Sequence, residues 1–139
     1  MGYGIDDIRL IEFPKINDIR GNLSFLENNN QIPFKIKQTS WLFDIPTNFE
    51  TEEYALKKSH QLIISVSGSF EVSINDGNYN LNFMLNKANE GLYIPNLLWT
   101  KLDNFSTNSV ALFLCNESVN EIDKFRNFKE FLKFRNEIR

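Results

Sequence analysis

The chain contains a single histidine, which limits the proton-transfer chemistry that it can perform. His60 lies in the stretch Thr51–Gln61, which reads TEEYALKKSHQ and directly precedes an apolar run. Histidine suits proton transfer at carbon because its ordinary pKa lies near neutrality. In a regular strand His60 would share a face with Tyr54 and Leu56, since side chains alternate. His60 is therefore a candidate base, although we favour a structural hydrogen-bonding role.

Other reactive side chains are few. Cys115 ends the apolar run Val110–Cys115 and is expected to be a buried strand residue. A single cysteine forms neither an internal disulfide nor a cysteine metal cluster. Glu52 and Glu53 are adjacent, so on a strand they face opposite ways and do not form an acid–base pair. With one histidine and no cysteine cluster, we expect no metal.

Composition and charge exclude several function classes. The net charge is −3 without a long single-sign block, which argues against nucleic-acid binding through basic patches. No apolar stretch approaches the roughly 18–20 residues needed to span a bilayer. The segment Met1–Asp7 lacks the basic region and apolar core of a signal peptide. We therefore expect a cytoplasmic protein with no membrane association, forming one domain over residues 1–139.

The elements that must position these side chains are mainly short strands. The segment Asn75-Asp76-Gly77-Asn78 is a strong hairpin signal, because Asp-Gly tolerates the positive φ angles of tight turns. Leu62–Val66 is almost entirely apolar, which predicts a strand covered on both faces. Regularly spaced short strands with turn residues between them indicate a β-sandwich or barrel. The alternating or apolar runs are Ile8–Phe13, Leu23–Leu26, Phe34–Phe43, Leu62–Val66, Phe70–Ile74, Tyr79–Phe83, Leu92–Ile94 and Val110–Cys115.

The C-terminal segment has a different pattern. It contains no glycine or proline from Asn120 onward, and Ile122, Phe125, Phe128 and Leu132 follow helical spacing. We predict a helical segment over about residues 120–137, as one or two short helices packed on the β core or on a second subunit. The thirteen phenylalanines of the chain favour a tightly filled interior or a buried subunit interface.

A succession of short motifs resembles one enzyme family. The motifs are Asp18-Ile19-Arg20-Gly21-Asn22-Leu23, Ile32–Lys37, Lys57–Gln61, Val66–Val72, Asn75-Asp76-Gly77, Gly91–Ile94, Trp99 and Asn120–Phe128. Their order and spacing resemble those of the cupin-fold thymidine-diphosphate-linked hexose 3,4-ketoisomerases. The resemblance implies a mostly β cupin-type jelly-roll sandwich, a homodimer, a dTDP-linked sugar or nucleotide as ligand, no metal and no cofactor. It also implies a cytoplasmic role in making deoxysugars for surface polysaccharides.

The resemblance fails at the residues that would transfer protons. The family motif Arg-Gly-x-His-x-His-Lys-Lys matches residues 51–58, so its two histidines fall on Tyr54 and Leu56. The spacing predicts that both side chains face the interior. Tyrosine has an ordinary pKa of about 10, and leucine transfers no proton. We therefore expect normal isomerase activity to be lost or altered, with Tyr54 and Leu56 at the catalytic positions and His60 as a possible substitute.

The resemblance also suggests substrate-binding residues, several of which depart from the family. They are Arg20, Gln38, Ser40, Trp41, Trp99 and Thr100. Arg20 either binds the diphosphate or lies in a surface turn, and Trp99 either stacks on the ligand or fills the core. Trp41 replaces a family tyrosine and either stacks on the ligand, fills the core or blocks the pocket, while Thr100 replaces a histidine or arginine.

Three functions remain open from the sequence. The first is a nucleotide-sugar-binding protein without the usual isomerisation. The second is an active ketoisomerase or epimerase that uses Tyr54, His60 and Arg20. The third is a non-catalytic interaction cupin whose pocket is filled by Trp41 and Leu56.

Overall fold

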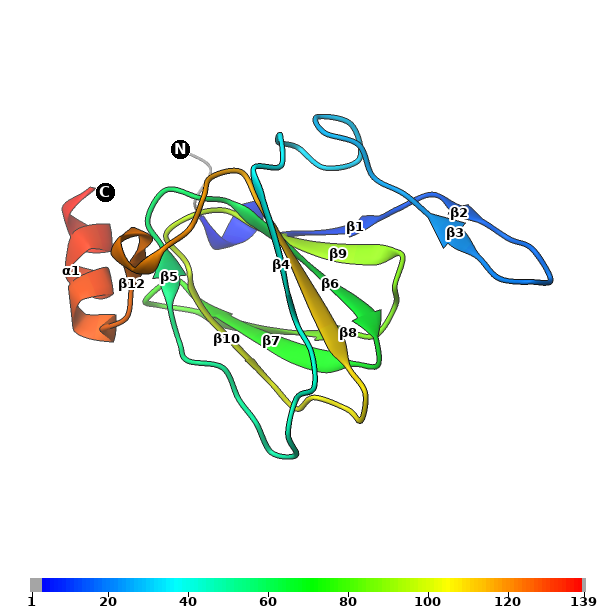
Figure 1. Cartoon of the computed structure of the whole chain (residues 1–139). Helices are drawn as coiled ribbons and strands as arrows, with labels where there is room; N and C mark the ends of the chain where they lie inside the picture. The colour runs from blue at the N-terminus through cyan, green and yellow to red at the C-terminus, as the bar shows by residue number, and fades with distance from the viewer. Residues whose placement is uncertain (1–3, 139) are drawn as a thin grey trace.

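Two antiparallel sheets stacked on each other form the body of the protein, seen in a computed structural model that describes residues 4–138 (Figure 1). The larger sheet has the order β1-β9-β6-β11-β4 and the smaller one β10-β7-β8, while β12 pairs with β5 and β2 with β3. The strands are β1 Arg9–Glu12, β2 Lys15–Ile16, β3 Leu23–Ser24, β4 Gln38–Leu42, β5 Ala55–Leu56, β6 Gln61–Ser67, β7 Phe70–Asn75, β8 Asn80–Leu85, β9 Glu90–Ile94, β10 Trp99–Asp103, β11 Val110–Cys115 and β12 Lys124–Phe125. The helices are α1 Phe128–Glu137 and two 3₁₀ turns, Ile5–Asp7 and Glu121–Asp123. The expected mostly β architecture with a C-terminal helix is confirmed, and residues 1–3 and 139 of the expected domain lie outside the described residues.

The apolar core lies between the two sheets. On β7 the buried residues alternate, so that Phe70, Val72 and Ile74 point inward. The central strand β6 is covered on both faces, as its apolar run predicts. Ile63 joins the core between the sheets, whereas Leu62 belongs to a second cluster on the outer face of the larger sheet.

The predicted hairpin connects β7 and β8. The Asn75 side-chain oxygen accepts a hydrogen bond from the Gly77 backbone N–H at 2.6 Å. The Asp76 carboxylate accepts bonds from the backbone N–H groups of Asn78 and Tyr79 at 2.8 and 2.7 Å. Gly77 has a φ of +100°, a conformation that glycine adopts without a steric penalty.

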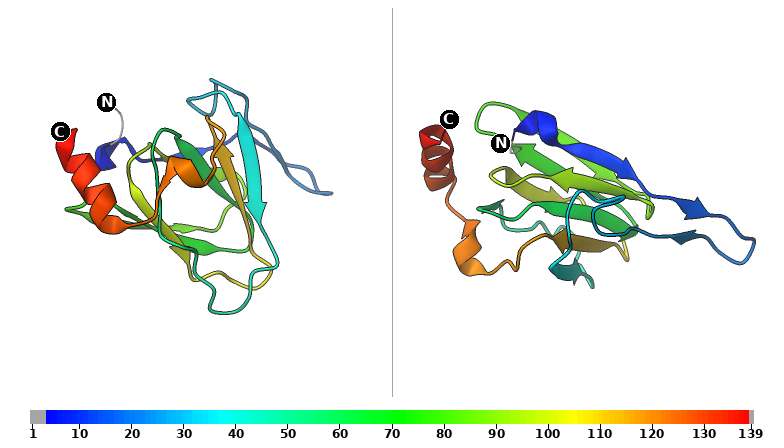
Figure 2. Two further views of the ribbon diagram at one scale, coloured as in Figure 1. Left: turned by 60° about the vertical axis from the view of Figure 1, so that its left-hand side comes forward. Right: turned by 90° about the horizontal axis from the view of Figure 1, so that it is seen from above.

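A hairpin arm formed by β2 and β3 extends away from the sandwich, at the end opposite α1 (Figures 1 and 2). Its apolar side chains are exposed in this single chain, with Ile16 at 55% and Leu23 at 61% of full exposure. Exposed apolar side chains gathered on one element indicate a surface that another molecule covers.

The C-terminal helix is shorter than the predicted 120–137. It begins at Phe128, because the Asn127 side chain caps it by accepting a bond from the Glu130 backbone N–H at 3.1 Å. The residues before Asn127 form a 3₁₀ turn and the extended strand β12 instead. The helix packs on the β core through Phe131, which is fully buried against Trp99. No helix within residues 4–138 is both long and apolar enough to cross a membrane.

Candidate functional site

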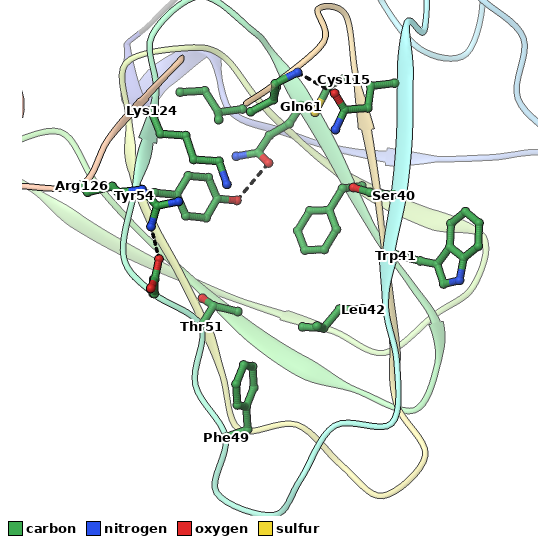
Figure 3. A pocket seen from close by; sticks show the side chains of 15 residues that line it. Ser40, Trp41, Leu42, Phe49, Thr51, Tyr54, Gln61, Cys115, Lys124 and Arg126 are labelled. Carbon is green, nitrogen blue, oxygen red and sulfur yellow. Dashed lines mark hydrogen bonds and ion pairs between the residues drawn. The ribbon is translucent and has the colours of Figure 1, made fainter. Parts of the chain in front are cut away.

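An open cavity of about 370 Å³ lies between β4 at the edge of the larger sheet and the segment that leads into β5 (Figure 3). Its wall combines polar and apolar side chains from the larger sheet, from the segment that leads into and includes β5, and from the C-terminal segment. The lining residues are Gln38, Ser40, Trp41, Leu42, Phe49, Thr51, Glu52, Tyr54, Leu56, Gln61, Phe113, Cys115, Val119, Lys124 and Arg126.

Tyr54 and Leu56 both line this cavity, as their spacing predicts. Tyr54 is fixed by two backbone hydrogen bonds with Thr100, at 3.0 and 2.7 Å. Its phenol donates a hydrogen bond to the side-chain oxygen of Gln61 at 3.1 Å. Burial raises the pKa of Tyr54 above its ordinary value of 10, so the phenol stays neutral near pH 7. The pair therefore provides one hydrogen-bonding hydroxyl and one apolar wall, and no group that titrates near neutrality.

The three predicted residues of β4 lie on two different faces of the strand. Gln38 and Ser40 face the cavity, since they pair with Cys115 and Phe113, which also line it. Trp41 contributes to the rim, but its indole points away from the cavity and is 58% exposed (Figure 3). The orientation of the indole therefore argues against the alternative in which Trp41 blocks the pocket, because strand alternation directs it to the outer face.

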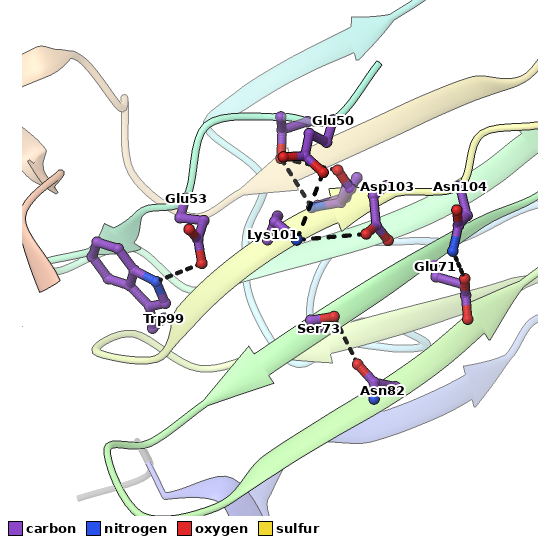
Figure 4. Close-up of polar contacts among 11 residues, drawn as sticks. Glu50, Glu53, Glu71, Ser73, Asn82, Trp99, Lys101, Asp103 and Asn104 are labelled. Atoms are coloured by element: carbon purple, nitrogen blue, oxygen red, sulfur yellow. Dashed lines mark hydrogen bonds and ion pairs between the residues drawn. The ribbon is translucent and has the colours of Figure 1, made fainter. Parts of the chain in front are cut away.

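Trp99 and Thr100 do not line the cavity. The Trp99 indole N–H donates to the Glu53 carboxylate at 3.2 Å (Figure 4), and its ring packs against Phe128 and Phe131. Thr100 is fully buried and its hydroxyl donates to the Leu98 carbonyl at 3.2 Å. Trp99 thus anchors the C-terminal helix, and Thr100 supports Tyr54 through its backbone.

His60 lies on the other face of the larger sheet. The strand does not continue regularly from Tyr54 to His60, because β5 ends at Leu56 and a new strand begins at Gln61. Gln61 points into the cavity, whereas the His60 ring stacks on Tyr93 and hydrogen-bonds with its hydroxyl at 2.5 Å. Burial lowers the pKa of His60, which favours the neutral ring. This geometry agrees with the structural role that we favoured.

Arg20 lies in the turn of the arm, away from the cavity of its own chain. Its guanidinium pairs with the Asp18 carboxylate at 3.2 Å, and both side chains are exposed. The pair raises the pKa of Arg20 and lowers that of Asp18. Within one chain, Arg20 does not meet the other predicted site residues.

Several cavity residues were missing from the sequence prediction, above all Lys124 and Arg126. Both belong to the segment over about residues 120–137 that was predicted to be helical. The Lys124 ammonium lies over the Tyr54 ring, 5.2 Å from its centroid. Arg126 forms ion pairs with the carboxylates of Glu52 and Glu121. Asn127 is the signal that could have found them, because a helix that starts after this capping residue leaves Lys124–Arg126 extended.

The cavity is better suited to binding than to abstracting a proton. Its polar groups are mainly neutral amides and hydroxyls, and burial raises the pKa of the Cys115 thiol, which disfavours the thiolate. Within residues 4–138, no group of three histidine, cysteine or acidic side chains is placed to hold a metal ion. The arrangement can hydrogen-bond a polar ligand against apolar walls.

Comparisons with known proteins extend over nearly the whole chain. The model of the family described as "FdtA: WxcM-like, C-terminal" matches residues 6–136. A TDP-4-oxo-6-deoxy-alpha-D-glucose-3,4-oxoisomerase from Aneurinibacillus thermoaerophilus is 32% identical over 126 residues, which is 91% of each chain.

Solved structures agree with these sequence matches. A 3,4-ketoisomerase from Helicobacter canadensis has a TM-score of 0.90 at 35% identity, covering 94% of this chain and 98% of its own. A mutant of the 3,4-ketoisomerase QdtA from Thermoanaerobacterium thermosaccharolyticum, in which a histidine is replaced by asparagine, was solved in complex with TDP-4-keto-6-deoxyglucose. It has a TM-score of 0.90 at 28% identity, covering 94% of each chain.

Proposed function

Because the chain belongs to the FdtA (WxcM-like, C-terminal) family, we propose that it binds a dTDP-linked deoxysugar in the cavity beside β4 without catalysing the usual 3,4-ketoisomerisation. Its sequence relatives identify the chain as a nucleotide-sugar 3,4-ketoisomerase-like cupin. The substrate class comes from those relatives, one of which holds TDP-4-keto-6-deoxyglucose. The proposed setting is the cytoplasmic synthesis of surface-glycan sugars.

One observation carries this proposal. The cavity is open, yet its two expected catalytic positions hold a neutral tyrosine and a leucine. Moving a carbonyl between neighbouring sugar carbons requires a group that removes a proton from carbon and returns one elsewhere. Neither Tyr54 nor Leu56 suits that step, whereas both can line a binding site. The open cavity also gives less support to the interaction cupin with a filled pocket.

An active isomerase that uses Tyr54, His60 and Arg20 has less support, because these residues do not meet in one cavity. His60 contacts Tyr93 on the outer face of the sheet, and Arg20 lies in the arm. Acid–base groups must come within hydrogen-bonding reach of the same substrate.

We further propose that the protein acts as a homodimer whose interface includes the β2–β3 arm. The exposed Ile16 and Leu23 support this, because a second copy would remove them from water. Arg20 is remote from the cavity of its own chain. In such a dimer it would bind a phosphate only in the cavity of the other copy.

Titration calorimetry with thymidine diphosphate tests the binding part of the proposal. We expect saturable binding, which Leu56→Trp should abolish by filling the cavity with a bulky neutral side chain. Lys133→Ala, an exposed change on α1, should leave binding unchanged. Absence of binding to the unmodified protein at millimolar thymidine diphosphate would contradict the proposal.

A further inference from the structure

The strand pair β5–β12 brings a cation into the cavity from the C-terminal segment. In the antiparallel register Lys124 lies opposite Leu56, and Phe125 lies opposite Ala55. Residues directly opposite each other project from the same face of a sheet. Leu56 lines the cavity, and so Lys124 does too, while Phe125 and Ala55 join the apolar cluster beneath α1.

The position of Lys124 is defined by its contacts. The Lys124 ammonium lies 5.2 Å from the centroid of the Tyr54 ring, within the range of a cation–π interaction (Figure 3). That contact involves the charge of the ammonium and leaves its N–H groups able to donate to ligand oxygens. The partly buried Tyr54 is itself held in place by hydrogen bonds with Thr100 and Gln61, which fixes the position of its ring.

The charges around the cavity favour an anion. Three charged residues line it, namely Lys124, Arg126 and Glu52. Arg126 pairs with Glu52 and also with Glu121, outside the lining, whereas Lys124 forms no ion pair within residues 4–138. The lining therefore carries one cation more than it has carboxylates, and among the residues that the structure describes Lys124 has no carboxylate partner.

Arg126 is placed to assist Lys124. The two residues are two positions apart, so on an extended strand they project to the same side, roughly 7 Å apart along the backbone. The carboxylates that hold Arg126 are largely exposed, and exposed ion pairs contribute little free energy. A phosphate oxygen can therefore replace one of them at small cost, and the guanidinium fork suits phosphate well.

We propose that Lys124 is the principal diphosphate-binding residue of this site, with Arg126 as its neighbour. The inference rests on the proposed function, because it names the group that holds the nucleotide sugar. It assigns the anionic part of the ligand to the cavity mouth formed by β12, and it leaves the wall formed by Tyr54, Gln61 and Leu56 to the sugar.

Titration calorimetry at low salt with the full chain tests this assignment. We expect Lys124→Gln to weaken thymidine diphosphate binding by roughly tenfold to a hundredfold, the effect of losing a hydrogen bond to a charged group. Lys124→Arg should retain most of the affinity because it keeps the charge. Lys129→Gln is the matched control, since it removes the same charge from an exposed site on α1. Binding of uncharged thymidine should not respond to Lys124→Gln.

The outcomes separate the two proposals. If the unmodified protein does not bind thymidine diphosphate, the proposed function fails and this inference with it. If it binds, but Lys124→Gln and Lys129→Gln have equal effects, only the role of Lys124 is overturned. If Lys124→Gln weakens TDP-4-keto-6-deoxyglucose but not thymidine diphosphate, Lys124 contacts the sugar, and the diphosphate assignment is wrong.

Discussion

The phenol of Tyr54 and the side-chain oxygen of Gln61 form a hydrogen bond of 3.1 Å that links the segment before β5 to the larger sheet. Tyr54 comes from the segment that leads into β5, and Gln61 begins β6 of the larger sheet. Both residues line the cavity, so the bond places a neutral hydroxyl in its wall. It also commits the phenol proton to an amide, which disfavours its use in acid–base chemistry.

Tyr54→Phe should therefore reduce stability. The substitution removes the donor to the buried Gln61 and keeps the ring, so we expect a loss of about 1 kcal/mol in the free energy of unfolding. Denaturant unfolding followed by fluorescence measures it. Tyr79→Phe is the control, because Tyr79 is 69% exposed and its change should stay within about 0.5 kcal/mol. Equal effects of the two substitutions would show that the Tyr54–Gln61 bond contributes no stability.

His60 should make stability depend on pH below neutrality. Burial lowers its pKa in the folded protein below the ordinary value of 6.5, so the unfolded chain takes up the proton first as the pH falls. The stability contribution of neutral His60 is complete above pH 6.5 and declines as the pH falls from there to the folded pKa. Unfolding measured between pH 7.5 and 5 should show this decline, and it should be smaller in His60→Asn. If stability declines with pH in His60→Asn as steeply as in the unmodified protein, the decline does not arise from His60.

The arm should control the oligomeric state. Ile16→Lys combined with Leu23→Lys places two charges on the surface that we assign to the homodimer, so the variant should sediment as a monomer where the unmodified protein sediments as a dimer. Tyr79→Lys adds a charge at another exposed aromatic site and should not alter sedimentation. A dimer that survives the double substitution would place the interface elsewhere.

Restoring histidine at both catalytic positions should restore proton transfer. Tyr54→His with Leu56→His directs two imidazoles into the cavity, where general acid–base groups typically accelerate proton transfer by a factor of 10² to 10⁴. We expect exchange of the proton at C3 of TDP-4-keto-6-deoxyglucose to rise by roughly a hundredfold over the unmodified protein, as measured by NMR in D₂O. Each single substitution serves as a control and should give less than the pair. No gain in a variant that still binds the sugar would show that the sugar is not held in register.

Local sequence predicted most of the sheet elements, for physical reasons that individual residues illustrate. Gly77 accepts the positive φ that its hairpin requires, and the run Leu62–Val66 is apolar because β6 is covered on both faces. The side-chain alternation around Tyr54 and Leu56 likewise placed both of them in the cavity.

The rest depended on tertiary contacts that local patterns do not encode. His60 does not share a face with Tyr54 and Leu56, as it would in a regular strand, because the chain ends one strand at Leu56 and begins another at Gln61. The helical spacing of the apolar residues around Lys124 predicted that it belongs to a helix. The pairing of β12 with β5 overrides that preference. Arg20 matched a binding motif, whereas the arm carries it away from its own cavity. Each difference arises from which strands pair, which periodicity alone does not determine.

The most direct test of binding without isomerisation is one NMR experiment on TDP-4-keto-6-deoxyglucose with the unmodified protein in D₂O. Saturation transfer from the protein reports contact with the thymine and sugar protons, and the intensity of the C3 proton reports exchange in the same sample. We predict saturation transfer to both parts of the ligand with no loss of the C3 signal beyond the protein-free rate. Loss of the C3 signal would show an active catalyst, and absence of saturation transfer would show that the nucleotide sugar is not the ligand.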